Sequence, residues 1–274
     1  MIVESAPAKV NLVLHVGPPR ADGLHPLCSL FCSIDLADEV QVEPAEVDQV
    51  TCPGVGPQNL AERALDEFRV EVGEAASPLS VRIDKRIPVA AGLGGGSADA
   101  AAVLRAANRL AEEPLALEDL VALASRVGSD VPSQVRPGHA VVSGLGEQVE
   151  SVLLPRLALV LLPSEGLSTG EVYAELDRLQ AWREDIDPEP LRELATGTVP
   201  EIADGVENDL ERAALSLRPE REPALEHLRR VGAIAAAISG SGPTAFGLFR
   251  STQEAAEATS RMEGALLTHA YAAP

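Results

Sequence analysis

Apolar and polar residues alternate with a period of two between residues 10 and 16. This spacing is typical of a β-strand, because successive side chains of a strand point to opposite faces. We predict further strands over residues 27–36, 39–42 and 79–87, and we take Asp38 as the break between the first two.

Helical spacing begins after Asn59, a residue that suits a helix N-cap, and recurs through the rest of the chain. We predict helices over residues 97–111, 117–127, 169–179, 209–217, 220–231 and 252–263, and strands over 140–143, 148–152, 157–162, 233–238 and 244–249. Residues 181–206 are rich in Asp, Glu and Pro, and we expect a surface insertion with one short helix. The pattern predicts an α+β fold of two domains, residues 1–152 and 153–274.

Composition limits the core and the partners. Apolar residues make up 46% of the 274 residues but aromatic residues only 3%, so we expect a core of Ala, Val, Leu and Ile. The formal net charge is −20. Such a surface repels phosphodiester backbones and anionic membranes, which argues against nucleic-acid and membrane partners. An anionic ligand must therefore be held by backbone amides, a helix N-terminus and a few cations.

The three cysteines, Cys28, Cys32 and Cys52, have no second Cys or His pair at zinc spacing. We interpret them as reduced core thiols and predict no metal site built from protein ligands. The longest apolar run, residues 157–162, is far shorter than the ~18 residues of a membrane span. We therefore expect a cytoplasmic protein, either a monomer or a weak homodimer.

One segment, Pro-Val-Ala-Ala-Gly-Leu-Gly-Gly-Gly-Ser-Ala over residues 88–98, joins a predicted strand to a predicted helix. Its glycines let successive amides point into one concavity, and the helix N-terminus adds unpaired amides and partial positive charge. We predict a phosphate-binding loop, in which Ser97 offers its hydroxyl to a phosphate or to Mg²⁺. The pattern G-x-G-x-x-G fails at Ser97, and the loop has no lysine of a Walker A motif. A plain Gly-rich turn is the alternative.

The chain has two lysines, Lys9 and Lys85, and every other basic residue is Arg. Lys9 and Asn11 are two residues apart in a strand, so they share a face. A solvated edge-strand charge is the alternative. Lys85 comes just before the Gly-rich loop, where an ordinary exposed strand end is the stronger interpretation.

Three further segments have a functional and a structural interpretation. Asp130 is a candidate acid in Gly-Ser-Asp-Val-Pro, although a helix cap with Pro in the first turn also fits. Asp99 follows the Gly-rich loop and can simply complement the helix dipole. The small residues 239–244 can hold a backbone close to a ligand or form a plain turn.

Taken in order, Pro-Ala-Lys-Val-Asn-Leu at residues 7–12, the Gly-rich loop and residues 239–244 resemble the three motifs of the GHMP kinase superfamily. The resemblance spans the chain. It implies an ATP-dependent small-molecule kinase that uses Mg²⁺. It also implies a ribosomal-S5-like N-terminal domain and a ferredoxin-like C-terminal domain.

Residue roles follow from the same resemblance. Asp130 would be the general base for a substrate hydroxyl, and Lys9 would orient that hydroxyl and keep Asp130 ionised. ATP would be bound by Lys85, Pro88, Ala91, Gly92, Leu93, Gly94, Gly95, Gly96, Ser97 and Ala98. Substrate would be bound by Asn11, Leu24, His25, Tyr173, Gly240 and Ser241.

Residues 7–12, 20–25, 84–88 and 128–132 are most similar to a branch that phosphorylates a cytidine-diphosphate-linked polyol. There His25 would hydrogen-bond the cytosine edge and Tyr173 would stack on the base. Leu24 departs from the Tyr of that branch, and base–aromatic stacking is worth ~1–3 kcal/mol. A homoserine or mevalonate kinase, or a nucleotide-binding module without catalysis, are the alternatives.

Overall fold

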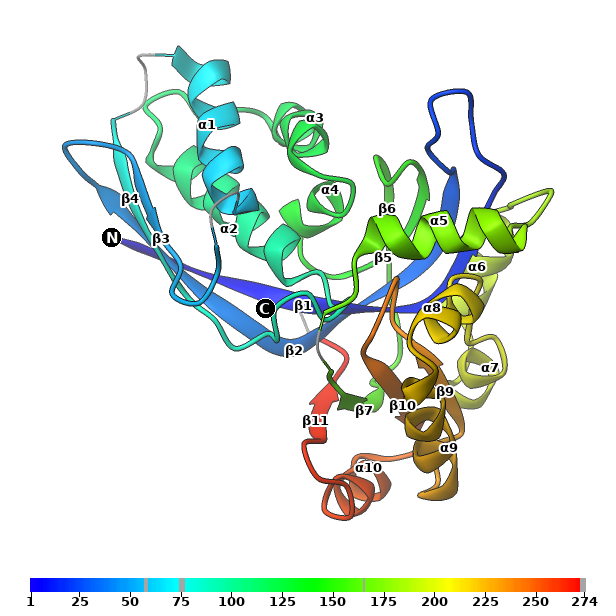
Figure 1. Ribbon diagram of the computed structural model, residues 1–274. Helices are drawn as coiled ribbons and strands as arrows, with labels where there is room; N and C mark the ends of the chain where they lie inside the picture. The colour runs from blue at the N-terminus through cyan, green and yellow to red at the C-terminus, as the bar shows by residue number, and fades with distance from the viewer. Residues whose placement is uncertain (57–58, 74–76, 165, 272–274) are drawn as a thin grey trace. The chain divides into compact units, whose positions relative to one another are not determined.

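The computed structural model describes residues 1–56, 59–73, 77–164 and 166–271 (Figure 1). Its strands are β1 (Ile2–Val16), β2 (Leu27–Pro44), β3 (Gln49–Thr51), β4 (Leu79–Asp84), β5 (His139–Gly144), β6 (Gln148–Val152), β7 (Ala158–Leu162), β8 (Glu207–Asn208), β9 (Ala235–Ile238), β10 (Ala245–Phe249) and β11 (Leu266–His269). Its helices are α1 (Leu60–Val72), α2 (Gly95–Leu110), α3 (Leu117–Val127), α4 (Val131–Val135), α5 (Thr169–Leu179), α6 (Glu189–Ala195), α7 (Val199–Asp204), α8 (Glu211–Leu217), the 3₁₀ helix η2 (Pro219–Arg221), α9 (Glu222–Arg230) and α10 (Thr252–Thr259).

The first of two compact units contains residues 1–8, 36–89 and 94–137. In this unit β4 pairs antiparallel with the second half of β2 and parallel with β3. Figure 1 shows α1, α2, α3 and α4 together on one side of these strands. Helix α2 contacts the other three helices, and it buries the small side chains of Ala98, Ala100, Ala101, Ala102, Ala106 and Ala107. Small side chains allow helices to approach closely, which explains a core built with so few aromatic residues.

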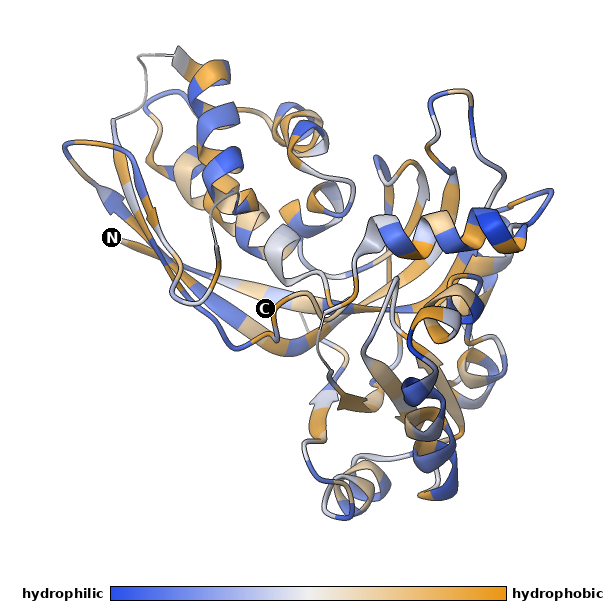
Figure 2. Cartoon of the chain, in the orientation of Figure 1, coloured by the Kyte–Doolittle hydropathy of each residue, from blue (hydrophilic) through white to orange (hydrophobic). Residues whose placement is uncertain are grey.

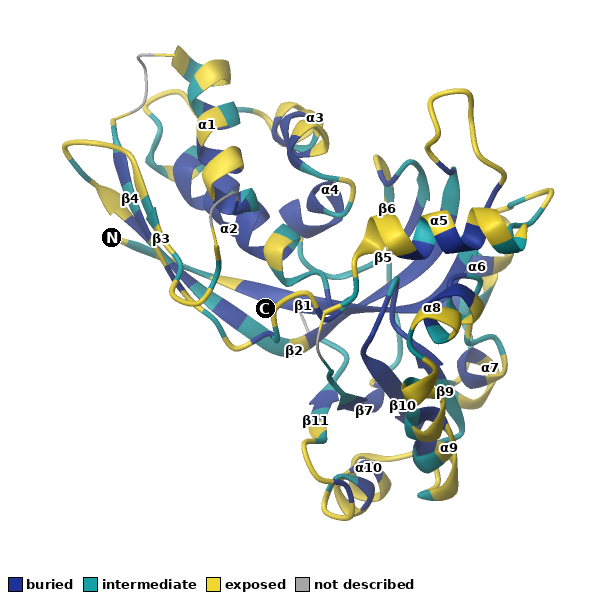
Figure 3. Ribbon diagram, viewed as in Figure 1, coloured by how far each residue is buried: buried dark blue, intermediate teal, exposed yellow. Residues whose placement is uncertain are grey.

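The second unit contains residues 9–35, 90–93 and 138–274. The first part of β2 pairs antiparallel with β5, which pairs antiparallel with β6, and β1 pairs parallel with β8. A separate antiparallel sheet has the strand order β11-β7-β10-β9. Strand β10 is buried along its whole length (Figure 3). Its Phe249 packs in one core with Val160 of β7 and Leu228 of α9.

Most predicted elements are confirmed, and so is the α+β class. Helices α3 and α5 have the predicted bounds, and Asn59 caps α1 because its side chain accepts a hydrogen bond from the Ala61 amide. Figure 2 shows hydrophobic and hydrophilic residues on α1 and α5, as expected for helices with one buried face.

Two expectations about local structure are wrong. Strand β2 runs through Asp38 without a break, because that carboxylate is buried and accepts hydrogen bonds rather than facing solvent. Residues 181–206 contain two short helices, α6 and α7, instead of one. The strand predicted over residues 10–16 is confirmed as part of β1, which is buried on both faces from Ala6 to Leu14.

Strands β1 and β2 each contribute residues to both compact units, so neither unit is one continuous stretch of chain. The predicted domain boundary near residue 152 stays a prediction. No helix in the described part of the chain is long and apolar enough to cross a membrane.

Candidate active site

The Gly-rich loop leaves β4 and enters α2, and its residues 90–93 belong to the second unit while residues 94–98 belong to the first. Gly92 has a φ of 75°, and a Cβ there would lie 2.5 Å from the Ser239 carbonyl oxygen. Both the conformation and the close approach therefore require glycine. The N-cap of α2 is Gly94, which has no side chain to occupy the first amides of the helix. These amides are suited to an anion.

Within the second unit, hydrogen bonds join the Gly-rich loop to the two other predicted motifs. The Lys9 amide donates to the Leu93 carbonyl at 3.0 Å. The Ser239 hydroxyl donates to the Gly92 carbonyl at 3.0 Å. Segments that are far apart in the sequence are thus fixed against one another by one backbone and one side-chain hydrogen bond.

Lys9 and Asn11 share a face of β1, as predicted. The Lys9 ammonium donates to Asn11 Oδ1 at 2.7 Å, and the Asn11 amide nitrogen donates to the Ser29 hydroxyl at 2.9 Å. Lys9 is 4% exposed and Asn11 2%, so the alternative of a solvated edge charge is wrong. The Lys9 ammonium also lies 4.5 Å from the centroid of the Phe31 ring, a cation–π contact.

Gly240 brings the third motif to the same place. A Cβ at Gly240 would lie 3.2 Å from Asn11 Oδ1, 3.5 Å from the Gly92 carbonyl oxygen and 3.7 Å from Lys9 Nζ. The Asn208 side chain donates to the Gly240 carbonyl at 2.8 Å and to that of Ile238 at 2.8 Å, which holds this loop in position. All three motifs therefore meet around Lys9.

The next residue, Ser241, links this loop to helix α5. Its hydroxyl lies 3.0 Å from the Thr169 hydroxyl at the start of that helix. The 239–244 segment is therefore more than a plain turn between strands, because it contacts both the Lys9–Asn11 pair and α5.

Asp130 occupies the N-cap position of α4, with Pro132 in the first turn, but its side chain makes no cap hydrogen bond. The helix-cap alternative therefore does not account for this carboxylate. Asp130 is half-buried and belongs to the first unit, whereas Lys9 belongs to the second.

His25 lies in an aromatic cluster of the second unit. Its Nδ1 is 2.8 Å from the Gly17 carbonyl oxygen, which assigns the proton to Nδ1. The side chain is 2% exposed, and its Nε2 lies 3.2 Å from Asp177 Oδ1 but in no hydrogen-bond geometry. A buried Nε2 without a hydrogen-bond partner in the described structure suits a ligand that donates one.

Tyr173 and Trp182 both lie beside His25. The ring centroid of His25 is 5.4 Å from that of Tyr173 and 6.2 Å from that of Trp182, with interplanar angles of 46° and 53°. Leu24, by contrast, is 53% exposed. Trp182 is absent from the sequence-based site, although its being the only tryptophan of the chain was a signal that could have singled it out.

Lys85 is not the exposed strand end that the stronger interpretation predicted. Its ammonium lies 2.5 Å from Asp38 Oδ2 and 2.7 Å from Asp99 Oδ2, and its side chain is 13% exposed. Asp99 is 2% exposed, so pairing with Lys85, rather than the helix dipole alone, explains its presence in α2.

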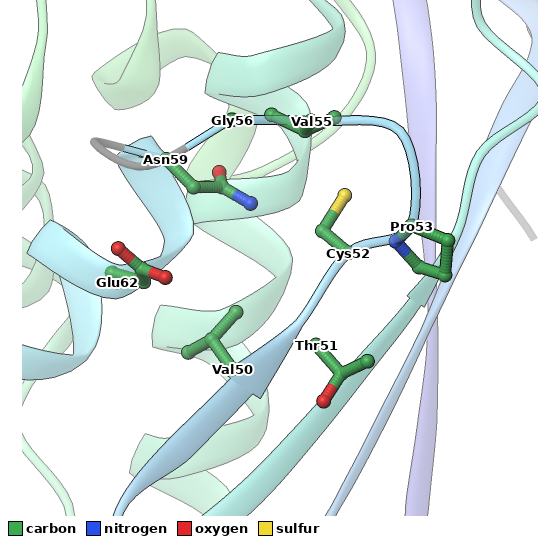
Figure 4. A pocket seen from close by; sticks show the side chains of 8 residues that line it. All are labelled: Val50, Thr51, Cys52, Pro53, Val55, Gly56, Asn59 and Glu62. Atoms are coloured by element: carbon green, nitrogen blue, oxygen red, sulfur yellow. The ribbon is translucent and has the colours of Figure 1, made fainter.

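A pocket of about 270 Å³ opens in the first unit beside these residues (Figure 4). Figure 4 shows the side chains of Cys52, from the loop after β3, and Asn59, from the start of α1, pointing toward one another among the residues that line it. Burial is the largest cause that raises the pKa of Cys52; the charges of Asp99 and Asp38 raise this pKa further, and the charge of Lys85 lowers it. The pocket is lined by Val50, Thr51, Cys52, Pro53, Val55, Gly56, Asn59 and Glu62, none of which the sequence pattern indicated as site residues.

The three cysteines are free thiols, as predicted. Burial is the largest cause that raises the pKa of Cys28 to about 11, so this thiol is unreactive at neutral pH. Among the described residues, no three His, Cys, Asp or Glu side chains come together as a metal site.

Comparison with protein families gives two matches, to the GHMP kinases N terminal domain over residues 59–140 and to GHMP kinases C terminal over residues 190–266. Among curated proteins, 4-diphosphocytidyl-2-C-methyl-D-erythritol kinase of Mycolicibacterium smegmatis is 42% identical over 275 residues, covering 94% of this chain and 85% of that protein. The enzyme of the same name from an Anaeromyxobacter species is 43% identical over 263 residues, covering 90% and 80%.

Solved structures agree. A crystal structure of 4-(cytidine 5'-diphospho)-2C-methyl-D-erythritol kinase has a TM-score of 0.82 and 34% identity, covering 99% of this chain and 100% of that one. Homoserine kinase from Cytophaga hutchinsonii has a TM-score of 0.71 at 18% identity, covering 98% and 93%, which shows a shared fold alone.

Proposed function

Since the chain belongs to the GHMP kinases, and within them to the 4-diphosphocytidyl-2-C-methyl-D-erythritol kinases, we propose that it phosphorylates the 2-hydroxyl of that cytidine-diphosphate-linked polyol. It is an ATP-dependent small-molecule kinase, and the product is an intermediate of non-mevalonate isoprenoid precursor biosynthesis. The observation that carries the proposal is the convergence of Gly92 and Gly240 on the buried Lys9–Asn11 pair.

The transfer needs a base, a positioned hydroxyl and stabilisation of charge on the phosphoryl group. Asp130 accepts the proton of the substrate hydroxyl. At the same time the oxygen of that hydroxyl bonds to the γ-phosphorus of ATP, and the bond from this phosphorus to the leaving ADP breaks. Lys9 orients the hydroxyl and balances the charge on the phosphoryl group. Asn11 fixes Lys9 through the 2.7 Å hydrogen bond and supports substrate near the reacting centre.

ATP phosphates bind the amides of residues 93–97, where the uncapped start of α2 supports an anion. Mg²⁺ neutralises charge on the phosphates when bound. Ser97 is half-buried in the first turn of α2. Its hydroxyl oxygen would suit a hard cation such as Mg²⁺ at the start of this helix. Few protein ligands are needed, because Mg²⁺ in kinases is held largely by phosphates and water.

The pocket lined by Cys52, Asn59 and their neighbours receives the base of ATP. Ligand sites for whole molecules run from ~300 to 1,000 Å³, so a pocket of about 270 Å³ suits a base better than a complete nucleotide. A Cβ at Gly96 would lie 3.7 Å from the Leu60 side chain, so the start of α2 lies next to the start of α1, which lines the pocket.

Cytosine recognition is assigned to His25 and Tyr173. The Nε2 of His25, which makes no hydrogen bond in the described structure, accepts one from the ligand, and the exocyclic amine of cytosine is a donor. Tyr173 lies beside the imidazole, where its ring can stack on the base. The exposed Leu24 supplies an aliphatic contact at the place of the second aromatic residue.

ADP release by purified protein with ATP and Mg²⁺ tests the proposal, in separate reactions with the cytidine-linked polyol, homoserine and mevalonate. We expect turnover with the first compound only. Turnover of homoserine or mevalonate would assign another kinase of the superfamily. ATP binding without turnover of any acceptor would support the binding-module alternative. A cytoplasmic location, and a monomer or weak homodimer, stay predictions.

A further inference from the structure

Three charged side chains, Lys85, Asp38 and Asp99, meet beneath the start of the phosphate-binding loop. They come from three different elements: Asp38 from the middle of β2, Lys85 from just after β4, and Asp99 from the first turns of α2. The side chain of Asp38 is 0% exposed, that of Asp99 2% and that of Lys85 13%. Two carboxylates and one ammonium are thus almost removed from water.

The hydrogen bonds of Asp38 satisfy an ionised carboxylate. Its Oδ1 accepts from the amides of Arg86 and Ile87 at 2.5 and 2.8 Å, and its Oδ2 accepts from Lys85 at 2.5 Å. These bonds fix the chain where it leaves β4 toward the loop. Because they are charge-assisted and buried, they are among the stronger hydrogen bonds that a protein forms.

Asp99 is only half satisfied. Its Oδ2 accepts from Lys85 at 2.7 Å, but its Oδ1 is buried with no hydrogen-bond partner in the described structure. Burial raises the pKa of Asp99 to about 7, against the lowering effect of Lys85 and with a further rise from Asp38. A proton on Asp99 removes the unpaired negative charge and lets the acid donate to Asp38.

The cluster also touches the loop itself. A Cβ at Gly95, the first residue of α2, would lie 3.3 Å from Lys85 Nζ and 3.0 Å from Ile87 Cγ2. The same three side chains therefore hold the exit of β4 and the first turn of α2, which are the two ends of the loop. The ammonium of Lys85 already donates to Asp38 and Asp99. These contacts reduce the attraction that it can exert on a phosphate.

We propose that Lys85, Asp38 and Asp99 are positioning residues that set the α2 amides for ATP, and that they do so with a proton held on Asp99. Lys85 then acts on ATP through the loop and not by direct contact. This rests on the proposed ATP site. Among the described residues, the charged and titratable groups that act on Asp99 are Lys85 after β4 and Asp38 in β2, together with Cys52 after β3, which hydrogen-bonds to the uncharged Asn59 at the start of α1.

Two variants, Asp99→Asn and Asp99→Ala, distinguish the effect of protonating Asp99 from the effect of removing its hydrogen-bonding side chain. Asn copies the protonated acid, because it donates and accepts but carries no charge. We expect Asp99→Ala to raise KM for ATP about tenfold, since it leaves one donor of the buried Lys85 ammonium without its acceptor. We expect Asp99→Asn to stay within about twofold of the parent at pH 6.5. Asp84→Asn, at the exposed end of β4, is the matched control and leaves KM unchanged.

The pH profile is the readout that a merely structural role would not move. In the parent protein KM for ATP rises between pH 6 and pH 8, as Asp99 loses its proton. In Asp99→Asn that rise is absent relative to the parent, while the titration of ATP itself is common to both. An unchanged KM in Asp99→Ala overturns the positioning role. An Asp99→Asn variant as impaired as Asp99→Ala shows that the ionised carboxylate is needed, and overturns the role of the proton.

Urea unfolding gives a second, independent test if Asp99→Ala fails to fold. A carboxyl with a raised folded-state pKa stabilises the protein at acidic pH and loses that contribution as pH rises through about 7. The free energy of unfolding should fall from pH 5 to pH 8 by more in the parent than in Asp99→Asn. Equal slopes contradict the proposal. ADP binding, measured by calorimetry, separates this outcome from a wrong acceptor substrate, because it requires no turnover.

Discussion

The two lysines of this chain lie in different units and have different partners. Lys85, in the first unit, is held between two carboxylates at 2.5 and 2.7 Å. Lys9, in the second, donates to a neutral amide oxygen at 2.7 Å and lies against the Phe31 ring. Both are buried, so neither is an ordinary surface charge. Lysine thus joins structural elements in the first unit and lies where three motifs converge in the second.

Replacing Lys9 with Met gives the largest expected effect. The apolar chain fills similar space but removes the ammonium, and loss of a group that stabilises transition-state charge typically costs ~10²–10³ in kcat. We expect kcat to fall about a thousandfold with KM for ATP little changed. Steady-state kinetics measure both. A rise in KM alone would mean that Lys9 binds ground-state ATP and takes no part in the transfer.

Replacing Lys85 with Met should affect stability and ATP binding more than the transfer step. Removing one partner of a buried ion pair costs about 3–5 kcal/mol of stability, because it leaves charge uncompensated. We expect a lower free energy of unfolding in urea and a raised KM for ATP, with a smaller loss of kcat than in Lys9→Met. If kcat falls as far as in Lys9→Met while KM and stability are unchanged, the two lysines share one catalytic role.

Leu24→Tyr is the smallest expected change, and it improves binding. An aromatic ring at this exposed position would add stacking to that of Tyr173, worth ~1–3 kcal/mol where bases stack on proteins. We expect KM for the cytidine-linked polyol to fall a few-fold, while KM for ATP stays constant. An unchanged KM for the polyol would mean that another side chain, with Trp182 the nearest candidate to His25, already covers the base.

Local pattern predicted much of this molecule. The Gly-rich loop between strand and helix, the cap at Asn59 and the shared face of Lys9 and Asn11 all depend on residues close in sequence, and the structure confirms each of them. The contact of Gly240 with Asn11 joins residues more than 200 positions apart. Only resemblance to a family, and not spacing, anticipated that the motifs of these residues work together.

Long-range partners explain what the pattern missed. An Asp in a strand looks like a break, and Asp38 proved otherwise because its partners Arg86 and Ile87 lie 48 and 49 residues away. Lys85 looked exposed because its partners, Asp38 and Asp99, are also distant in the sequence. The pocket lined by Cys52 and Asn59 is formed by a loop and the start of a helix. Its polar residues look in the sequence like ordinary loop and helix-cap residues. These residues have their roles because tertiary packing buries them. Burial of this kind cannot be predicted from the local sequence pattern.

The proposed phosphoryl transfer depends most directly on Asp130, whose side chain makes no cap hydrogen bond at α4. Asp130→Asn keeps the shape of the side chain and removes the base, and its turnover of 4-diphosphocytidyl-2-C-methyl-D-erythritol should be measured beside ADP binding by calorimetry. We expect kcat to fall by at least about a thousandfold, while the affinity for ADP stays within about twofold of the parent. Normal turnover by Asp130→Asn would show that Asp130 is not the base.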